Sequence, residues 1–302
     1  WPDRPWHSNN ITCLRGSISR MARDDDMDYT LLGLVVMERS GPDFTTNDVG
    51  DAWLLHLPCH SVYTAEREAY SNLVNGLTPP ETATWRNPYR EWIGAQIRAD
   101  FWGYAAPGRP ELAAEFAWRD ARLSHVKNGI YGEMWMAASI AAAFVVDDPA
   151  EAIRVGLSEI PAECRLTQAV EQVLGWHAEG ISREAMLDRI EEAFGTYHGV
   201  HTINNAALVV AGILLGNQDL GATICTAVEG GWDTDCNGAS AGSLVGAMIG
   251  ADPIPYEWVG PLNDTLETAL SGIGSCAPLR FSDLAARSVA QARRVLNETP
   301  AV

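Results

Sequence analysis

Segments with the periodicity and composition of helices dominate this sequence of 302 residues. Residues 29–39 (YTLLGLVVMER) are apolar and stop at a serine, a glycine and a proline, which is typical of a helix end. Residues 129–144 carry small and apolar side chains throughout, as a helix packed on all sides does. Alternating, strand-like stretches are nearly absent. Further helices are predicted over residues 45–57, 110–123, 166–178, 182–194, 204–215 and 239–249.

We therefore expect an all-α fold, a compact multi-helix orthogonal bundle with roughly ten or more helices. Hydrophobic residues make up 47% of the chain, which is enough apolar material for a large core. Neither a low-complexity linker nor a clear repeat divides the chain. We expect one domain over residues 1–302.

Charge and composition narrow the classes of partner. The net charge of −18 argues against a protein that binds nucleic acid, because no basic surplus can replace the counterions of the phosphate backbone. The longest apolar run, residues 137–146, is too short to span a bilayer, so no membrane partner is expected. The six cysteines form no Cys-x-x-Cys pair and are too sparse for a disulfide scaffold. Reduced, mostly buried cysteines and a cytoplasmic location are expected.

Two acidic segments carry the unusual chemistry. Residues 23–29 hold four carboxylates just before an apolar helix, and residues 230–238 hold two carboxylates between glycines and a small-residue helix. The first run alone could be a solvated helix N-terminus, which the helix dipole favours. The two carboxylates of the second segment are energetically unfavourable against an apolar helix unless a cation neutralises their charge. Carboxylate oxygens suit Mg²⁺, Mn²⁺ or Ca²⁺ better than zinc. If the segments meet in space, they could hold two ions.

In the order and spacing of its motifs, the chain resembles the ADP-ribosylglycohydrolases. Their hallmarks are an early Thr-Asp-Asp-Thr before an apolar helix and a late Gly-Gly-Asp-x-Asp-Thr/Ser-Asn. Here Asp24-Asp25-Asp26-Met27 stands in the early place, and residues 233–237 (DTDCN) stand in the late one, with Trp232 after the glycines. Residues 94–98 (GAQIR) resemble the family's Gly-(Ala/Ser)-Ala-Met-Arg loop, and Ser124-His125 resembles its Thr/Ser-His. The resemblance runs from about residue 23 to about residue 251.

The resemblance implies an all-helical fold and a site for two adjacent Mg²⁺ ions, with Mn²⁺ as a possible substitute. Asp24 falls where the family has a threonine ligand and Cys236 where it has a second hydroxyl ligand, so Asp24 is a candidate to compensate for the hydroxyl lost at 236. The ribosyl bond reacts through an oxocarbenium-like state, and a carboxylate such as Asp26 or Asp233 would orient the attacking water. The candidate catalytic residues are thus Asp26 and Asp233. The candidate metal-ligating residues are Asp24, Asp25, Asp26, Asp233, Asp235 and Cys236.

Three polar segments fit a substrate that carries a pyrophosphate. Residues 94–98 start with a glycine and could offer backbone amides to phosphate, and residues 128–132 open a helix, whose N-terminus attracts anions. Residues 197–205 are expected to contact substrate, although Asn204 could simply cap a helix. Trp232 could stack on a base or ribose, or belong to the core. The candidate substrate-binding residues are Gly94, Gln96, Arg98, His125, Asn128, Gly129, Tyr131, Gly132, His198, His201, Asn204 and Trp232.

The sequence departs from the family in one respect. Family members begin with a glycine-rich helix that carries an acidic residue essential to several of them, and nothing before Asp24 resembles it. We expect that helix upstream of residue 1; otherwise the chemistry proceeds without it. Glu66 could reach the site as an acid, but an exposed helical glutamate paired with Arg67 or Arg90 is the favoured interpretation.

The leading functional hypothesis is Mg²⁺-dependent hydrolysis of the glycosidic bond in an ADP-ribosyl conjugate, whether that conjugate is a small molecule or an ADP-ribosylated protein. One alternative is hydrolysis of a small N-riboside or nucleotide in specialised metabolism. Another is a non-catalytic module that binds ADP-ribose.

Overall fold

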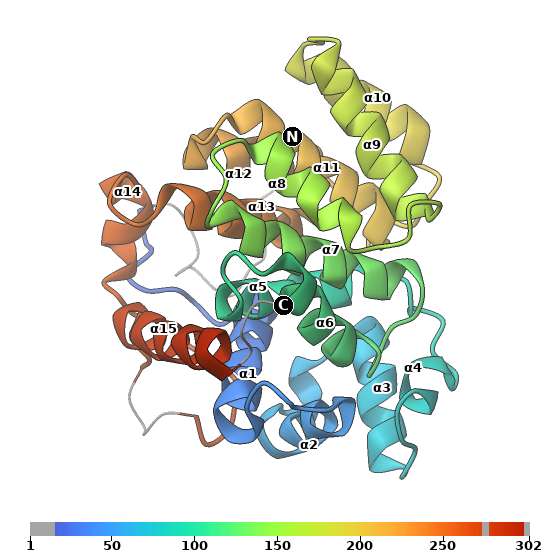
Figure 1. Cartoon of the computed structure of the whole chain (residues 1–302), viewed down its shortest axis with the longest axis vertical. Helices are drawn as coiled ribbons and strands as arrows, with labels where there is room; N and C mark the ends of the chain where they lie inside the picture. Colours follow the sequence, from blue (N-terminus) through green and yellow to red (C-terminus); the bar gives the residue numbers. More distant parts are fainter. Residues whose placement is uncertain (1–15, 274–277, 299–302) are drawn as a thin grey trace.

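The computed structural model describes residues 16–273 and 278–298 (Figure 1). Across these residues the regular structure is helical, and only isolated β-bridges occur. The predicted all-α fold is confirmed. Cys13 and Cys276 lie outside the described residues. The α-helices are α1 (Asp25–Ser40), α2 (Thr46–His56), α3 (Thr64–Val74), α4 (Glu81–Thr84), α5 (Ala99–Ala105), α6 (Pro110–Ala121), α7 (Asn128–Ala143), α8 (Pro149–Ser158), α9 (Arg165–Ala178), α10 (Arg183–Phe194), α11 (Thr202–Gly216), α12 (Leu220–Glu229), α13 (Thr234–Ile249), α14 (Tyr256–Val259) and α15 (Phe281–Glu298).

All eight segments predicted to be helical are helices, but two of them start four or five residues earlier than expected. Helix α1 begins at Asp25 because Asp24 caps it, accepting a hydrogen bond from the Asp26 backbone N–H at 2.9 Å. Helix α13 begins at Thr234 rather than at residue 239. Most of the acidic side chains therefore lie in first turns, where the helix dipole favours negative charge, and not in loops ahead of the helices.

Short and amphipathic helices complete the bundle. The helices without a counterpart in the predicted segments are α3, α4, α5, α8, α12, α14 and α15. Three 3₁₀ helices, η2 (Cys59–Ser61), η3 (Ile93–Arg98) and η4 (Gly260–Leu262), join longer elements. Of these, η3 matters most for the site because it enters the core directly before α5, with all six of its residues buried.

Helix α7 lies at the centre of the molecule (Figure 1). It packs against α5, α6 and α8 and also contacts α11 and α13. Trp135, Met136 and Ile140 have no exposed surface, as expected for a helix packed on all sides. Gly103 of α5 permits this packing, because a Cβ atom there would lie 2.6 Å from the Ile140 Cβ.

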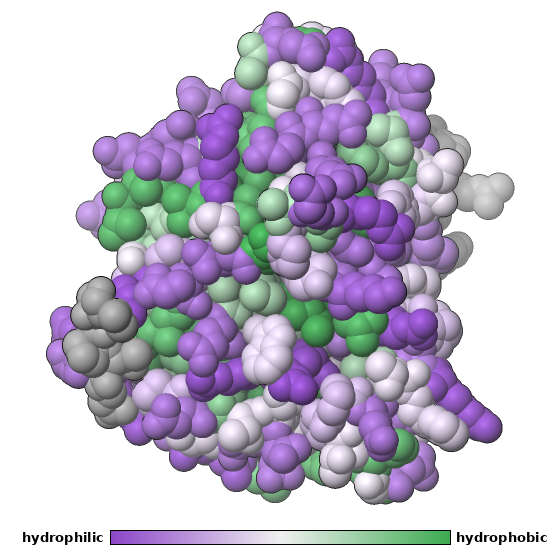
Figure 2. All heavy atoms as spheres, turned by 45° about the vertical axis from the view of Figure 1, so that its right-hand side comes forward, coloured by the Kyte–Doolittle hydropathy of each residue, from purple (hydrophilic) through white to green (hydrophobic). Residues whose placement is uncertain are grey.

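The surface of the described residues is mostly hydrophilic, with hydrophobic side chains in small patches on the face that Figure 2 shows. None of the helices in the described part of the chain combines the length and hydrophobicity that a membrane crossing requires. The four described cysteines are free, but the expectation that most are buried is wrong. Only Cys236 is buried, whereas Cys59 and Cys225 lie at the surface.

Candidate active site

The N-termini of α1 and α13 meet, so the two acidic segments form one cluster. The thiol of Cys236 lies 3.8 Å from Asp26 Oδ2. Ligand atoms of Asp26, Asp235 and Cys236 lie within 4.8 Å of one another, and so do those of Asp24, Asp25 and Asp26. Every residue of the predicted metal site except Asp233 thus belongs to one of two overlapping groups. Asp233 lines the cavity beside them.

A cavity of about 290 Å³ opens at this cluster. Its wall comes from α1, α3, η3 and α13, elements that are far apart in the sequence but adjacent in the bundle. The polar wall consists of carboxylates and hydroxyls, and apolar side chains cover the remainder. The cavity is lined by Asp25, Tyr29, Tyr63, Thr64, Glu66, Ile93, Gly94, Ile97, Val200, Asp233, Asp235 and Cys236.

Three carboxyls of the cluster, those of Asp25, Asp26 and Asp233, have raised pKa values. Burial and the charge of Asp24 raise the pKa of Asp26 well above its usual value. Burial and a hydrogen bond with Asp235 raise the pKa of Asp233 to about 7. Burial, followed by the charge of Asp24, also raises the pKa of Asp25. A divalent cation would relieve this repulsion, since it favours the charged form of every carboxylate.

Two further observations fit a hard cation. The Oδ1 atom of Asp26 is buried and has no hydrogen-bond partner, an arrangement that is costly unless a cation or water supplies the missing contact. Burial, together with the charge of Asp26, raises the pKa of the Cys236 thiol, which therefore stays protonated and donates to Asp26. Oxygen ligands are thus the donors that this cluster offers, as Mg²⁺ requires.

Asn205 fixes the start of α13, a role that sequence analysis missed. Its Oδ1 atom accepts hydrogen bonds from the Asp233 backbone N–H at 3.1 Å and from Asn237 Nδ2 at 2.9 Å. Its own Nδ2 donates to the carbonyls of Gly199 and His201. Asn205 belongs to the polar run 197–205 that the sequence singles out, but its partners lie on another helix, so only the three-dimensional structure reveals them.

Glu66 corrects an expectation. It is not an exposed glutamate paired with Arg67 or Arg90: it is only 3% exposed, lines the cavity, and accepts a hydrogen bond from Arg98 Nη1 at 2.8 Å. The reason is that α3 turns Ala65, Glu66 and Ala69 inward, and these three residues follow helical spacing. The small alanines beside Glu66 are the signal that could have indicated a buried face.

Arg98 is not available to bind phosphate. Its guanidinium is 2% exposed and is surrounded by three carboxylates. Nε donates to Asp120 Oδ2 at 2.6 Å, Nη1 donates to Glu66, and Nη2 lies 3.5 Å from Glu133 Oε2. Burial opposes the charge of Arg98, but these carboxylates raise its pKa above the usual value. The predicted phosphate loop is therefore a buried 3₁₀ helix that anchors an ionic cluster.

Most of the other predicted substrate-binding residues also pack in the interior or bond neighbouring elements and do not line the cavity. Among those twelve residues, Gly94 is the one that lines the cavity. Asn128 donates to Glu91 at 2.8 Å and accepts from the Leu166 N–H, and Tyr131 packs against the core. Several others are enclosed because neighbouring elements approach closely; a Cβ atom on Gly132, for example, would lie 2.6 Å from Thr202 Cγ2. Enclosed in this way are Gln96, His125, Gly129 and Gly132.

The loop before α11 borders the cavity through Val200 rather than through its polar residues. The ring of His198 stacks on Trp92 with 4.3 Å between centroids. His201, not Asn204, caps α11 by accepting from the Ile203 N–H. Asn204 lies inside the helix and donates to the His198 carbonyl. Trp232 is half-buried, packs against the core and lies beside Gly199; its backbone adopts φ +56°.

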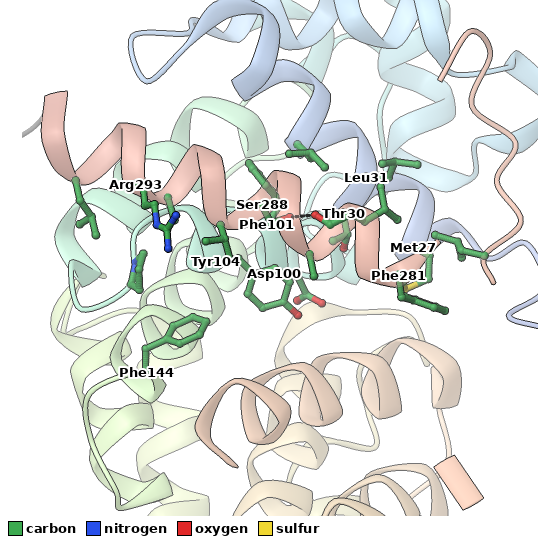
Figure 3. Close-up of a pocket in the computed structure, with 18 residues that line it drawn as sticks. Met27, Thr30, Leu31, Asp100, Phe101, Tyr104, Phe144, Phe281, Ser288 and Arg293 are labelled. Carbon is green, nitrogen blue, oxygen red and sulfur yellow. Dashed lines mark hydrogen bonds between the residues drawn. The ribbon is translucent and has the colours of Figure 1, made fainter. Parts of the chain in front are cut away.

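A larger cavity, of about 580 Å³, lies between α1, α5 and α15 (Figure 3). Met27, Leu31 and Leu34 line it from a different face of α1 than the one that carries Asp25 and Tyr29. Its wall is mostly apolar, apart from the carboxyl of Asp100, the guanidinium of Arg293 and a few hydroxyls. Hydrolysis needs convergent acids and polar donors, so the smaller cavity is the candidate active site despite its size.

Comparison with known families supports this assignment. The model of the family described as ADP-ribosylglycohydrolase matches residues 7–294, which is nearly the whole chain. A search of the curated proteins found no match.

Proposed function

Because the chain belongs to the ADP-ribosylglycohydrolase family, we propose that it is a Mg²⁺-dependent hydrolase that cleaves the glycosidic bond of an ADP-ribosyl conjugate. One observation carries the proposal: acidic side chains from two distant helix N-termini converge on a cavity, and a buried oxygen of Asp26 among them lacks a partner. Like charges that are brought together and partly buried destabilise a fold unless a cation compensates them, so a structural role alone does not explain this cluster.

Asp25, Asp26, Asp233 and Asp235 would hold the cations, and Asp24 would add a carboxylate where the family has a threonine. When bound, the cations supply positive charge that holds ribose hydroxyls and favours ionisation of water. Mg²⁺ fits an all-oxygen donor set, and Mn²⁺ could replace it.

The protein's own groups supply the remaining functions. Asp233 lines the cavity at the start of α13, and its carboxylate would accept a proton from the attacking water. Asp26 is fixed in the first turn of α1 and would orient that water. Ile93, Ile97 and Val200 form an apolar wall that limits access of bulk solvent to the bond. The cavity has the volume for the ribose and the bond to be cleaved, so the nucleotide part of the substrate would extend towards the surface.

Release of ADP-ribose is the test of this proposal. The protein is incubated with Mg²⁺ and either ADP-ribosyl-serine or ADP-ribosyl-arginine, and products are separated by chromatography. We expect ADP-ribose from at least one conjugate, loss of activity with a chelator, and a loss of about 10²-fold or more in Asp235→Asn. Glu184→Gln, in an exposed residue of α10, is the matched control. Binding without release would favour the non-catalytic module, and cleavage of free nucleosides alone would favour the riboside hydrolase.

A further inference from the structure

We infer that Glu66 is a catalytic acid, which protonates the leaving group when the ribosyl bond breaks. The inference rests on the proposed hydrolase function and adds a residue to it. It starts from the position of Glu66 on α3, on a different element from the acidic cluster, where it lines the same cavity as Asp25, Asp233 and Asp235.

The backbone of η3 leaves space for the Glu66 carboxylate. A Cβ atom on residue 94 would lie 2.1 Å from Glu66 Oε1 and 2.5 Å from Oε2, so only glycine permits this approach. Gly94 itself lines the cavity. Glycine at position 94 thus leaves the space in which the carboxylate lies at the cavity wall, where Arg98 Nη1 bonds it.

The two oxygens of Glu66 have different surroundings. Oε1 accepts a hydrogen bond from Arg98 Nη1 at 2.8 Å. Oε2 accepts a long hydrogen bond, of 3.5 Å, from the Thr64 hydroxyl and is not bonded by Arg98. Since Arg98 occupies Oε1, Oε2 is the oxygen that can carry and transfer a proton.

A purely structural role for Glu66 would leave its charge unexplained. Arg98 already contacts Asp120 at 2.6 Å and Glu133 at 3.5 Å. Burial raises the pKa of Glu133 well above its usual value, so Glu133 is neutral. Asp120 and Glu66 still leave one buried negative charge in excess of Arg98, which is destabilising unless a second proton reduces it.

The charged neighbours of Glu66 support a protonated form at neutral pH. Burial raises its pKa to about 7 even though Arg98 opposes the shift, and the charges of Asp25 and Asp120 contribute to the increase. His125 Nε2 lies 4.0 Å from Oε1, but burial lowers the pKa of His125 well below its usual value, so this ring stays neutral. Tyr29, on α1, is also neutral because burial raises its pKa.

Two proton transfers accompany cleavage of the ribosyl bond. The bond between the ribose C1 and the leaving oxygen or nitrogen breaks, and its electron pair goes to the leaving atom, which takes the proton from Glu66 Oε2. Water adds to C1 and gives its proton to Asp233. Proton transfer from Asp233 to Glu66 through solvent restores both groups.

The test compares two leaving groups, because only a poor one needs an acid. The serine of ADP-ribosyl-serine leaves as an alkoxide unless its oxygen is protonated. The 4-nitrophenol of ADP-ribosyl-4-nitrophenol leaves as a stable anion. In Glu66→Gln we expect kcat to fall by about 10²–10⁴-fold with the serine conjugate and by less than about tenfold with the nitrophenyl conjugate. Glu68→Gln, on the same helix but away from the cavity, is the matched control.

Several outcomes separate the possibilities. Equal losses with both substrates in Glu66→Gln would overturn the acid role and indicate a structural one. If that variant does not fold, the wild-type pH profile decides: kcat with the serine conjugate should fall above about pH 7, and kcat with the nitrophenyl conjugate should not. Identical profiles would also overturn the inference. If the wild-type protein cleaves neither substrate, the proposed function itself fails.

Discussion

At the scale of single residues, Gly94 links the fold to the chemistry. It lies on η3 between the cavity and the buried ionic cluster, and the Glu66 carboxylate occupies the space that a side chain at 94 would need. Gly94→Ala should therefore displace Glu66 from Arg98. We expect the free energy of unfolding to fall by ~1–3 kcal/mol, as overpacked cores show, with loss of hydrolysis of the serine conjugate.

Gly175→Ala is the matched control for this prediction, since a Cβ atom there meets nothing within 4 Å and the residue lies inside α9. It should be neutral or stabilise the helix by ~0.5–1 kcal/mol. Both variants are measured by denaturant unfolding. Wild-type stability and activity in Gly94→Ala would show that the Glu66 carboxylate is free to move, which contradicts the geometry.

At the scale of elements, the site depends on how α11 holds the start of α13. Asn205 accepts from the backbone of Asp233 and from Asn237, so its amide group sets where the second acidic segment lies. Asn205→Ala would leave both donors without a partner and should cost about 1–3 kcal/mol per buried group. Because Asp233 and Asp235 would then lose their position, we also expect weaker Mn²⁺ binding.

Calorimetric titration with Mn²⁺ and thermal unfolding test the role of Asn205 together. Asn75→Ala removes an exposed asparagine that bonds only the Ser71 carbonyl, and it should change neither result. If Asn205→Ala is destabilised but binds Mn²⁺ as the wild type does, then Asn205 supports the bundle and not the site.

At the scale of the whole molecule, buried carboxyls make stability depend on pH. Burial raises the pKa of Asp100, on α5 behind α1, to about 7 (Figure 3). Between about pH 4 and pH 7 the folded protein therefore keeps a proton at Asp100 that the unfolded chain releases, and the contribution of Asp100 to stability falls as pH rises. Asp100→Asn removes this penalty.

We expect Asp100→Asn to unfold at about the wild-type temperature at pH 4 and at a higher temperature at pH 8, with a gain of up to ~4 kcal/mol at the higher pH. Melting is followed in a chelator so that metal binding does not contribute. The exposed Asp51→Asn of α2 should melt as the wild type does at both values. A difference between Asp100→Asn and wild type that shrinks as pH rises would contradict the sign.

Local sequence was sufficient for eight of the helices and for each of the two acidic runs. The long apolar and small-residue segments specify α1, α7, α11 and α13 because helical periodicity is a local property. Asp24, Asp25 and Asp26 are adjacent in the chain, and so, nearly, are Asp233 and Asp235; each run therefore stays together whatever the fold. The order of these motifs also placed the chain in its family.

The surroundings of Glu66 and Arg98 were decided only by the tertiary structure. Their ionic cluster takes one residue from each of α3, η3, α6 and α7, and no spacing along the chain encodes that meeting. For the same reason the glycines and polar residues of η3 and α7 looked like a phosphate site, although helix packing buries them. Sequence determined which residues share a helix, whereas packing determined which charges lose water, and loss of water is what makes a carboxyl hold its proton near neutral pH.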